Sequence, residues 1–506
     1  MKRTLGGVGM LLAAAGLAAS LGLVSCGQKQ CRGETQGEGV AMAAQPGTLA
    51  YDRGMWQQLL SDHTRIRRVV KFTESGVEAT TESDDPEVAG RIIDHAKAMQ
   101  ERVKAGAQVR VWDPVFADLF KRHESVTLEI TPTERGVTIL EKSDDPETLM
   151  LLRSHALGVN DFVRNGHESG RRETRRLKVG DPVPVSEVAI GGVPHRFLMS
   201  QPDAGQVTML KNAGVSQLVN FRKPAEHANY DEAGAVKAAG MEYCNLPYAG
   251  PQELNDELLD QARAAIGDAN KIGRSAALHC RTGNRVGPGW ASYRVLDQGV
   301  PLAQALAEAR TIGTHDPLME SKTRDYIRRK SGDGGWATLS PDSMNDAQKS
   351  IYGRAIEARD AMFQRLFAAL GEAMAKPAPE GGPAGAIGVC KEQAPKIAQR
   401  VAKEMGVMIG RTSAKLRNPM NGAPTWAAGV LAATPTEPRV MTNADGSMGV
   451  ILPIKLSSAC LGCHGDPASM EPGVTAALHE KYPKDQATGF KEGDLRGWFW
   501  VEVPGK

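Results

Sequence analysis

The sequence has few cysteines and almost no excess of charge of either sign. It holds 7 Cys in 506 residues, which is too sparse for a scaffold stapled by disulfides. The formal net charge is +2, and it falls to 0 without the first 25 residues, whose charged members are Lys2 and Arg3. A neutral chain has no electrostatic footprint for nucleic acid, so we expect no nucleic-acid partner.

Long apolar runs are also missing, except at the amino terminus. Leu5 to Leu23 is almost wholly apolar or small, and no later run is long enough to span a membrane. Leu23-Val24-Ser25-Cys26-Gly27 follows it and resembles a bacterial lipobox, in which the cysteine is lipidated and becomes residue one. The resemblance implies a signal peptide over 1–25 and a membrane anchor at Cys26. It also implies a lipoprotein that faces the periplasm, in the outer membrane because Gly27 rather than Asp follows the cysteine. The alternative is an uncleaved anchor, since ~19 apolar residues nearly span a bilayer.

The rest of the chain is long enough for about three domains of ~150 residues each. Residues 26–50 are rich in Gly, Gln and Ala and predict a flexible tether. Folded domains are expected over 51–170, 183–330 and 345–506, with an arginine-rich linker before the second and a Gly/Ser/Asp-rich linker before the third. The expected class is a multi-domain mixture of α/β and α+β folds.

Residues 51–170 form two 60-residue repeats without a gap. Ser83-Asp84-Asp85-Pro86-Glu87 recurs as Ser143-Asp144-Asp145-Pro146-Glu147, and four histidines recur in the same register (His63 with His123, His95 with His155). Each unit predicts a short helix, two strands and a long helix, and Ser143 is the predicted cap of the second long helix. We expect a duplicated α+β module about a pseudo-twofold axis. The histidines are interpreted as inherited helix and cap residues, with a pseudosymmetric metal or haem site as the alternative.

Strands and helices alternate over 183–330, which predicts an α/β domain with a mainly parallel sheet. One apolar strand, Ser275 to His279, runs into Cys280-Arg281-Thr282-Gly283-Asn284-Arg285, and a helix is expected from Gly287. Loop amides and a helix amino terminus converge there on one point, which suits an anion and favours a nucleophilic thiolate at Cys280. Gly283 lets the loop close tightly, and Arg285 can clamp an oxyanion in bidentate fashion.

This segment resembles the cysteine-dependent phosphatases, and within them the dual-specificity-phosphatase-like domain of beta-lactamase-hydrolase-like proteins. The loop carries the resemblance together with Ser200-Gln201-Pro202-Asp203, Val219-Asn220-Phe221-Arg222 with Glu226, and Leu246-Pro247. It implies that Cys280 is the nucleophile, that Arg285 binds the oxyanion, that His279 tunes the cysteine and that the substrate is phosphorylated. Asp256 is our candidate for the general acid that a phosphatase needs.

The loop departs from ordinary tyrosine phosphatases, because four residues rather than five separate Cys280 from Arg285. Four is also the rhodanese spacing, so a rhodanese-like sulfurtransferase is an alternative, as is an inactive anion-binding relative. Cys244 lies on a strand that we expect to neighbour the strand of Cys280. The two thiols would then form a disulfide in an oxidising compartment, or Cys244 would be a buried free thiol.

Cys460-Leu461-Gly462-Cys463-His464 has the spacing for covalent attachment of a c-type haem. Each thiol adds to one vinyl group, and the adjacent histidine lies under the iron as its proximal ligand. The alternative is a zinc or redox Cys-X-X-Cys site. Zinc would need two more ligands at knuckle spacing, and the sequence holds no second Cys-X-X-Cys. We therefore expect one covalent haem c and, because haem c is attached outside the cytoplasm, an exported chain.

The segment 345–506 resembles the PAS-like single-haem-c sensor domains of bacteria. The resemblance rests on the attachment motif and on Ile387 to Cys390, Gly410-Arg411-Thr412-Ser413, Arg417-Asn418-Pro419, Tyr482-Pro483 and Gly497-Trp498. It implies a PAS-like sheet and an axial pair of His464 and the thiolate of Cys390, whereas the residues alone leave Met405 or Met408 as alternatives. Arg411 and Arg417 are expected to pair with the haem propionates.

Together these patterns predict a lipoprotein in which a haem senses redox state or a gas and is coupled to a phosphatase-like domain. One alternative is an electron-transfer or haem-binding protein with an inactive phosphatase-like domain, and another is sulfurtransfer. Besides the membrane, the expected partners are a redox partner or a phosphorylated substrate.

Overall fold

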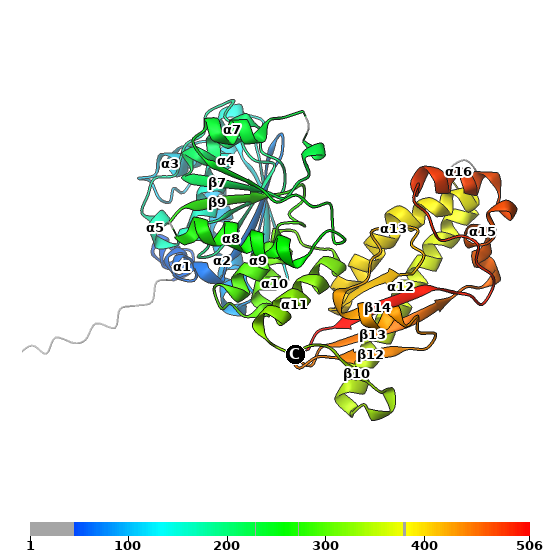
Figure 1. Cartoon of the computed structure of the whole chain (residues 1–506). Coiled ribbons are helices and arrows are strands. Elements are labelled where there is room, and N and C mark those ends of the chain that lie inside the picture. Colours follow the sequence, from blue (N-terminus) through cyan, green and yellow to red (C-terminus); the bar gives the residue numbers. More distant parts are fainter. Residues whose placement is uncertain (1–44, 228, 272, 378–380, 506) are drawn as a thin grey trace, which may run out of the picture. The chain divides into compact units, whose positions relative to one another are not determined.

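The computed structural model describes residues 45–505, with the exception of 228, 272 and 378–380. The predicted signal peptide and Cys26, the predicted lipidation site, lie outside the described residues. The described strands form two sheets, one of nine strands and one of five, and helices pack on both (Figure 1). The expected multi-domain α/β and α+β class is confirmed. In the described part, no helix combines the length and the apolar character needed to cross a bilayer.

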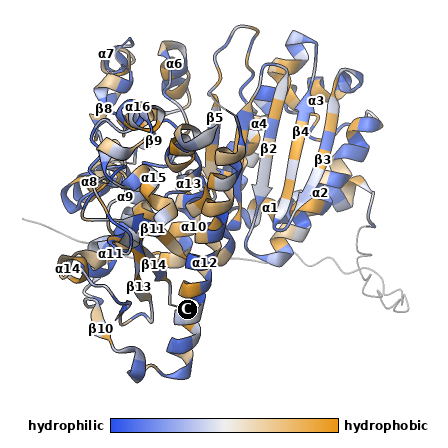
Figure 2. Cartoon of the chain, turned by 90° about the vertical axis from the view of Figure 1, so that its right-hand side faces the viewer, coloured by the Kyte–Doolittle hydropathy of each residue, from blue (hydrophilic) through white to orange (hydrophobic). Residues whose placement is uncertain are grey.

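Two copies of one unit make up the first part of the chain. The first copy consists of α1 (Leu49–Ser61), β1 (Arg67–Phe72), β2 (Gly76–Glu82) and α2 (Pro86–Lys104). The second consists of α3 (Pro114–Lys121), β3 (Thr127–Thr133), β4 (Gly136–Lys142) and α4 (Pro146–Asn165), and the short α5 (His167–Gly170) follows. Apolar and polar residues alternate along β3, as expected of a half-buried strand (Figure 2).

The two copies meet about a pseudo-twofold axis between β2 and β4. These strands pair antiparallel, with Gly76 opposite Lys142 and Glu82 opposite Gly136. Adding 60 to the number of Gly76 gives Gly136, and subtracting 60 from that of Lys142 gives Glu82, so one pair maps onto the other. The axis therefore relates the two repeats.

An aspartate, and not the predicted serine, caps each long helix. Asp145 is the N-cap of α4 and accepts the amide of Thr148, whereas Ser143 lies two residues earlier and accepts the amide of Asp145. Asp85 caps α2 in the same way. The prediction failed because serine and aspartate are both good caps, and only the proline in the first turn fixes where the helix starts.

The duplicated histidines include a pair that packs across the pseudo-twofold axis. A Cβ at Gly166 would come within 2.5 Å of the ring of His63, and a Cβ at Gly106 within 2.8 Å of the ring of His123. Among the described residues, no three His, Cys, Asp or Glu side chains come together as a ligand set for a metal ion. These contacts favour the interpretation of the histidines as packing residues.

The module and the following α/β segment share the nine-stranded sheet, whose order is β3-β4-β2-β1-β5-β6-β9-β7-β8. The junction is an antiparallel ladder between β1 and β5 (Ser186–Ile190), and β5 also pairs antiparallel with β6 (Arg196–Leu198). Beyond it, β6, β9 (Ser275–His279), β7 (Val215–Asn220) and β8 (Glu242–Asn245) run parallel. This half of the sheet is therefore mainly parallel, as the alternation of elements predicted.

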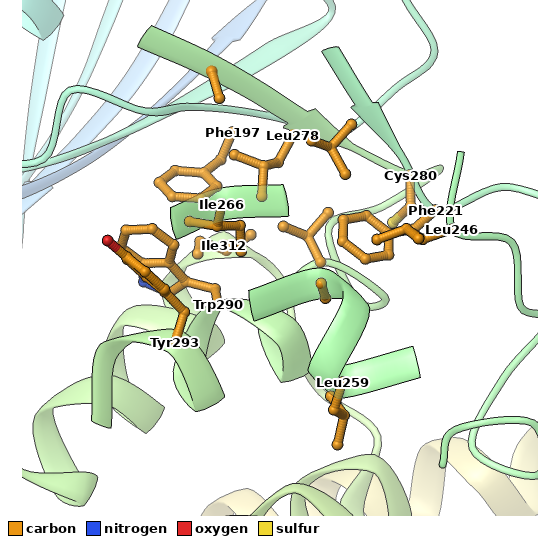
Figure 3. Packing of buried hydrophobic residues seen from close by; sticks show 14 of the residues in the cluster. Phe197, Phe221, Leu246, Leu259, Ile266, Leu278, Cys280, Trp290, Tyr293 and Ile312 are labelled. Atoms are coloured by element: carbon orange, nitrogen blue, oxygen red, sulfur yellow. The ribbon is translucent and has the colours of Figure 1, made fainter. Parts of the chain in front are cut away.

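Six helices accompany these strands: α6 (Ala204–Asn212), α7 (Glu232–Ala238), α8 (Asp256–Lys271), α9 (Gly287–Leu296), α10 (Leu302–Ile312) and α11 (Pro317–Ser331). The core beneath the sheet contains Phe197, Leu278 and Trp290 (Figure 3). Cys280 lies at one end of this cluster, beside Phe221 and Leu246 (Figure 3). Cys280 therefore lies where a parallel strand ends, at the edge of this hydrophobic core.

The prediction that Cys244 and Cys280 lie on neighbouring strands is wrong. Cys244 is on β8, and β7 stands between β8 and β9. Strands are about 4.8 Å apart, so two steps across the sheet exceed the ~7 Å between Cα atoms that a disulfide can bridge. Cys244, like the other four cysteines in the described part, is free.

The last part of the chain is built on an antiparallel sheet of order β10-β12-β13-β14-β11. Its strands are β10 (Ala337–Leu339), β11 (Met408–Thr412), β12 (Arg439–Thr442), β13 (Met448–Lys455) and β14 (Leu495–Val503). β10 comes from the segment expected to be a linker. The long helices α12 (Asp346–Ala375) and α13 (Gly382–Met405) pack on each other and on this sheet, and the short α14 (Ala428–Ala432), α15 (Leu461–His464) and α16 (Pro472–Lys481) lie in its connections (Figure 1).

Candidate functional site

Cys280 follows directly on β9, and the loop that it begins leads through Arg285 into α9. The cysteine is 1% exposed, and its Sγ accepts a hydrogen bond from the amide of Gly283 at 3.1 Å. Gly283 has φ +80°, and a Cβ there would come within 1.8 Å of the carbonyl oxygen of Ile312. Only glycine fits this position, so the tight closure inferred from the sequence has a steric cause.

Arg285 is held in place at the mouth of the loop by a carboxylate and a backbone carbonyl. Its two terminal nitrogens donate to the two oxygens of Glu226 at 2.6 and 2.7 Å, and Nη1 also donates to the carbonyl of Tyr248 at 2.8 Å. The hydrogen bonds from Arg285 lower the pKa of Glu226 to about 2. The guanidinium therefore has a fixed orientation before any anion binds.

His279 is buried, and its ring lies against Glu232 of α7. Its Nε2 is 3.0 Å from Oε1 of Glu232. The other oxygen of that carboxylate accepts hydrogen bonds from Asn220 at 2.5 Å and from the hydroxyl of Tyr243 at 3.1 Å. Glu232 was not among the predicted site residues, because nothing in its local sequence links an acidic residue on α7 to a histidine 47 positions later.

Asp256, the predicted general acid, is the first residue of α8 and is engaged elsewhere. Arg329 of α11 donates to both of its oxygens, at 2.6 and 2.9 Å, and this lowers the pKa of Asp256. A carboxylate held in its ionised form is poorly suited to donate a proton.

Asp316 differs from Asp256 because its pKa is raised rather than lowered. Its segment is hydrogen-bonded to the cysteine loop. It caps α11 through the amides of Leu318 and Met319, and Oδ1 of Asn284 accepts the amides of His315 at 3.0 Å and Asp316 at 3.4 Å. Burial raises the pKa of Asp316.

Tyr248 lies beside the loop, because its hydroxyl donates to the carbonyl of Arg285. Burial, together with the charge of Cys280, raises its pKa well above the ordinary value, and the charges of Arg285 and Asp316 act on it as well. Asp316 is joined to the loop through Asn284, whose Oδ1 accepts its amide. The sequence prediction missed it, because Asp316 lies 36 residues beyond the nucleophile in a different loop.

The Cys-X-X-Cys-His motif forms a second site, in the last part of the chain. Cys460 ends a 3₁₀ turn (Ser458–Cys460), and Cys463 and His464 lie on the short α15. Nδ1 of His464 lies 2.7 Å from the carbonyl of Ala487. Since only a protonated Nδ1 can donate to this carbonyl, the lone pair is on Nε2, which is the tautomer that binds a metal.

Cys390 of α13 faces the attachment motif. Ile387, one turn earlier on the same helix, packs in a cluster with Cys463 and Tyr482. Burial raises the pKa of Cys463, and the charges of Cys390 and Cys460 add to the effect. Met405 and Met408, the alternative ligands, pack in two other hydrophobic clusters.

The chemistry of this donor set fits a covalently attached haem. Cys460, Cys463 and His464 lie together in the motif, the charge of Cys390 acts on Cys463, and a Cβ on Gly462 would meet nothing within 4 Å. Arg417, predicted to bind a propionate, is bound instead by protein groups. It pairs with Asp485 at 3.0 Å and donates to the carbonyls of Cys463 at 2.5 Å and Ala487 at 3.1 Å.

One family model matches the part of the chain that contains the Cys-X-X-Cys-His motif. Residues 298–504 match the Tll0287-like family model. The resemblance of the C-terminal part to a haem-protein domain family is thereby confirmed. The crystal structure of the cyanobacterial heme-protein Tll0287 is 25% identical, and the match covers 33% of this chain and 97% of that one with a TM-score of 0.24. No curated protein matches the chain.

Cysteine phosphatases are among the other similar solved structures. Tk-PTP in its active form is 17% identical over 27% of this chain and 91% of that one, with a TM-score of 0.25. A putative phosphatase (DUF442) from Shewanella putrefaciens CN-32 is 22% identical over 28% of this chain and 87% of that one, with a TM-score of 0.24.

Proposed function

We propose that the chain is a c-type haem lipoprotein facing the periplasm, and that its haem regulates a cysteine-dependent phosphatase in the same chain. The family match supports haem binding by residues 298–504. Cys460 and Cys463 would hold the haem through thioether bonds, and His464 and Cys390 would be the ligands of its iron. Bound haem would supply redox and gas-binding chemistry, and a thiolate ligand favours the ferric state.

The Cys280 loop would hydrolyse phosphomonoesters in two steps. The thiolate attacks phosphorus, so that an S–P bond forms as the ester P–O bond breaks, and the leaving alkoxide takes the proton of Asp316. Arg285 and the loop amides hold the phosphoryl oxygens. Water then attacks the phosphocysteine and gives its proton to Asp316, which releases phosphate and restores the thiolate. Asp316 replaces Asp256 in this scheme, because burial favours its protonated form.

One observation carries the proposed coupling: the segment 417–422 contacts both sites. At one end Arg417 donates to the carbonyl of Cys463 in the attachment motif. At the other end the carbonyl of Met420 accepts a hydrogen bond from Gln252 at 2.6 Å. The methyl group of Met420 lies against Gly250, where a Cβ would be 2.3 Å away.

Gln252 belongs to the loop that holds the catalytic arginine. This loop begins at Tyr248, whose carbonyl accepts from Arg285 and whose hydroxyl donates to the carbonyl of Arg285. A shift of the attachment motif would thus reach the oxyanion-binding guanidinium through two short segments. Both segments have fixed hydrogen bonds, so the path does not require a long mobile linker.

The full chain, produced with a cytochrome c maturation system, tests the proposal. Denaturing electrophoresis with haem staining should show a coloured band, and p-nitrophenyl phosphate turnover should differ between the ferric and ferrous protein. Gln252→Ala should shrink that difference without changing the haem spectrum, whereas Gln261→Ala, on the exposed face of α8, should not. The double variant Cys460→Ser/Cys463→Ser lacks both haem-attaching thiols. It is therefore the control for a direct effect of the reductant on Cys280.

The four-residue spacing of the loop favours a second candidate, sulfurtransfer, and the same preparation decides between them. Transfer of sulfur from thiosulfate to cyanide, with phosphoesters untouched, would overturn the phosphatase assignment. Equal turnover in both haem states, with an active Cys280, would overturn the coupling alone.

A further inference from the structure

Three arginines gather around the haem-attachment motif with too few carboxylates to neutralise them. Arg411 lies on β11, Arg417 follows that strand, and Arg496 lies on β14, which pairs with β11. Asp485 forms an ion pair with Arg417. Within the described residues, neither Arg411 nor Arg496 forms an ion pair with a carboxylate. The cluster therefore carries two excess positive charges.

The excess positive charge is energetically unfavourable, because the three arginines are buried or partly buried. Arg496 is partly buried, and the charges of Arg417 and Arg411 act on it. Proteins rarely leave like charges partly buried without a counter-ion, because desolvation and mutual repulsion add. In the described part of the chain, no carboxylate forms an ion pair with Arg411 or Arg496 that would supply this counter-ion.

Arg496 also makes a contact that a haem ligand would not tolerate. Its Nε lies 3.3 Å from Nδ1 of His464, and its Nη1 donates to the carbonyl of Lys415 at 3.0 Å. Nδ1 already lies 2.7 Å from the carbonyl of Ala487 and needs its proton for that bond. Two N–H groups then face each other, so iron binding at Nε2 favours a movement of the guanidinium away from the ring.

We propose that Arg496 and Arg411 bind the two haem propionates. This inference rests on the haem attachment proposed above. Two carboxylates match the two excess charges, and guanidinium groups pair well with carboxylates. It also revises the sequence-based expectation, because Arg417 is occupied by Asp485 and two backbone carbonyls, which leaves its place to Arg496.

The inference predicts effects that differ between the loaded and haem-free protein. In the haem-free chain, Arg496→Gln removes a source of repulsion and should not lower the thermal midpoint. In the loaded chain the same change removes a propionate partner, so the thermal midpoint should fall. The midpoint reduction potential should shift to a more negative value, because a positive charge near the haem favours the added electron.

The experiment uses the full chain expressed with and without the maturation system. Thermal unfolding by circular dichroism is measured on both forms, and a spectroelectrochemical titration is run on the loaded form. Arg439→Gln is the matched control, since Arg439 is exposed on β12 and donates to the carbonyl of its neighbour Pro438. Arg417→Gln should lower the thermal midpoint of both forms, because its partners are protein groups.

The failures are distinguishable. A loaded Arg496→Gln protein with the potential and thermal midpoint of the Arg439→Gln control would overturn this inference and leave the haem proposal intact. A lower thermal midpoint in both forms would assign Arg496 a purely structural role and also overturn it. A wild-type chain that takes up no haem would overturn the haem proposal, and this inference with it.

Discussion

At the scale of single residues, the cysteine loop depends on groups that do no chemistry themselves. Gly283 allows the loop to pass against the carbonyl of Ile312, and Glu226 fixes the plane of the Arg285 guanidinium. Preorganised donors of this kind act on the charge that develops in a transition state, because they need no reorientation during the reaction.

Replacing Gly283 with alanine should abolish turnover and destabilise the protein by on the order of 3 kcal/mol, from strain at φ +80° and a collision with Ile312. Gly299→Ala is the control. Gly299 has φ +67° with nothing within 4 Å of a Cβ, so only about 1–2 kcal/mol of backbone strain is expected. Urea denaturation measures both. Equal losses for the two variants would show that the close contact at Gly283 is unimportant.

Glu226 should make stability depend on acid pH. Its pKa falls from 4.5 to about 2 on folding, because Arg285 donates to the carboxylate. A lowered pKa stabilises the folded state fully above pH 4.5, and this contribution is lost as the pH falls towards 2. Glu226→Gln should therefore be less stable than wild type at pH 7, with a difference that narrows between these values. Denaturation series at several pH values test this, and a constant difference would contradict it.

The motif residues of both sites can be predicted from the sequence, whereas most of the residues that contact them cannot. Cys280, Arg285, Cys460, Cys463 and His464 stand at fixed local spacings, which is why the motifs predict them. Asp316 and Arg496 join their sites through strand pairing and loop contacts that connect distant parts of the chain, so no spacing rule finds them. Glu226 is indicated only as part of the resemblance to the phosphatases. The ion pair of Asp256 with Arg329 does not support Asp256 as the general acid.

At the scale of elements, α11 links the cysteine loop to the five-stranded sheet. Its N-cap Asp316 lies by the cysteine loop, and further along the helix Arg328 pairs with the buried Glu502 of β14 at 3.0 Å. Ser321 of the same helix also donates to Glu502. The local sequence of the helix does not show that it contacts the second sheet.

The N-cap of α11 allows the proton donor to be tested apart from the helix. Asparagine caps helices about as well as aspartate, so Asp316→Asn should leave stability within about 0.5 kcal/mol of wild type. The side chain then has no acidic proton, so turnover of substrates with poor leaving groups should fall on the order of 10²-fold or more. Asp256→Asn should leave turnover unchanged. The reverse result would return the acid role to Asp256.

At the scale of the molecule, the nine-stranded sheet joins two parts that the sequence presents as separate. The composition of residues 167–180 indicates a linker, but β1 and β5 pair on either side of it from Arg67–Ile190 to Lys71–Ser186. Such pairing is invisible to a pattern search, because the hydrophobic alternation of a strand identifies its faces and not its neighbour.

The shared sheet should unfold as one unit. Val70 of β1 is 0% exposed, and Val70→Ala should cost about 2 kcal/mol or more. Hydrogen exchange followed by mass spectrometry should then show faster exchange in β9 as well as in β1. Val450→Ala, an equally buried change in the five-stranded sheet, should leave both strands as they are in wild type. Acceleration confined to β1 and β2 would mean that the module opens independently.

The position of the duplicated module also determines which strand borders on solvent. Without β1, the fully buried strand β5 would present a row of unpaired N–H and C=O groups, a template for strand addition and aggregation. With the module in place the outermost strand is β3, which carries exposed Glu129 and Pro132. Proline cannot donate a ladder hydrogen bond, and a charged outer strand discourages further pairing. The repeats thus cover an edge strand that could pair with another chain, and they provide an edge strand that disfavours such pairing.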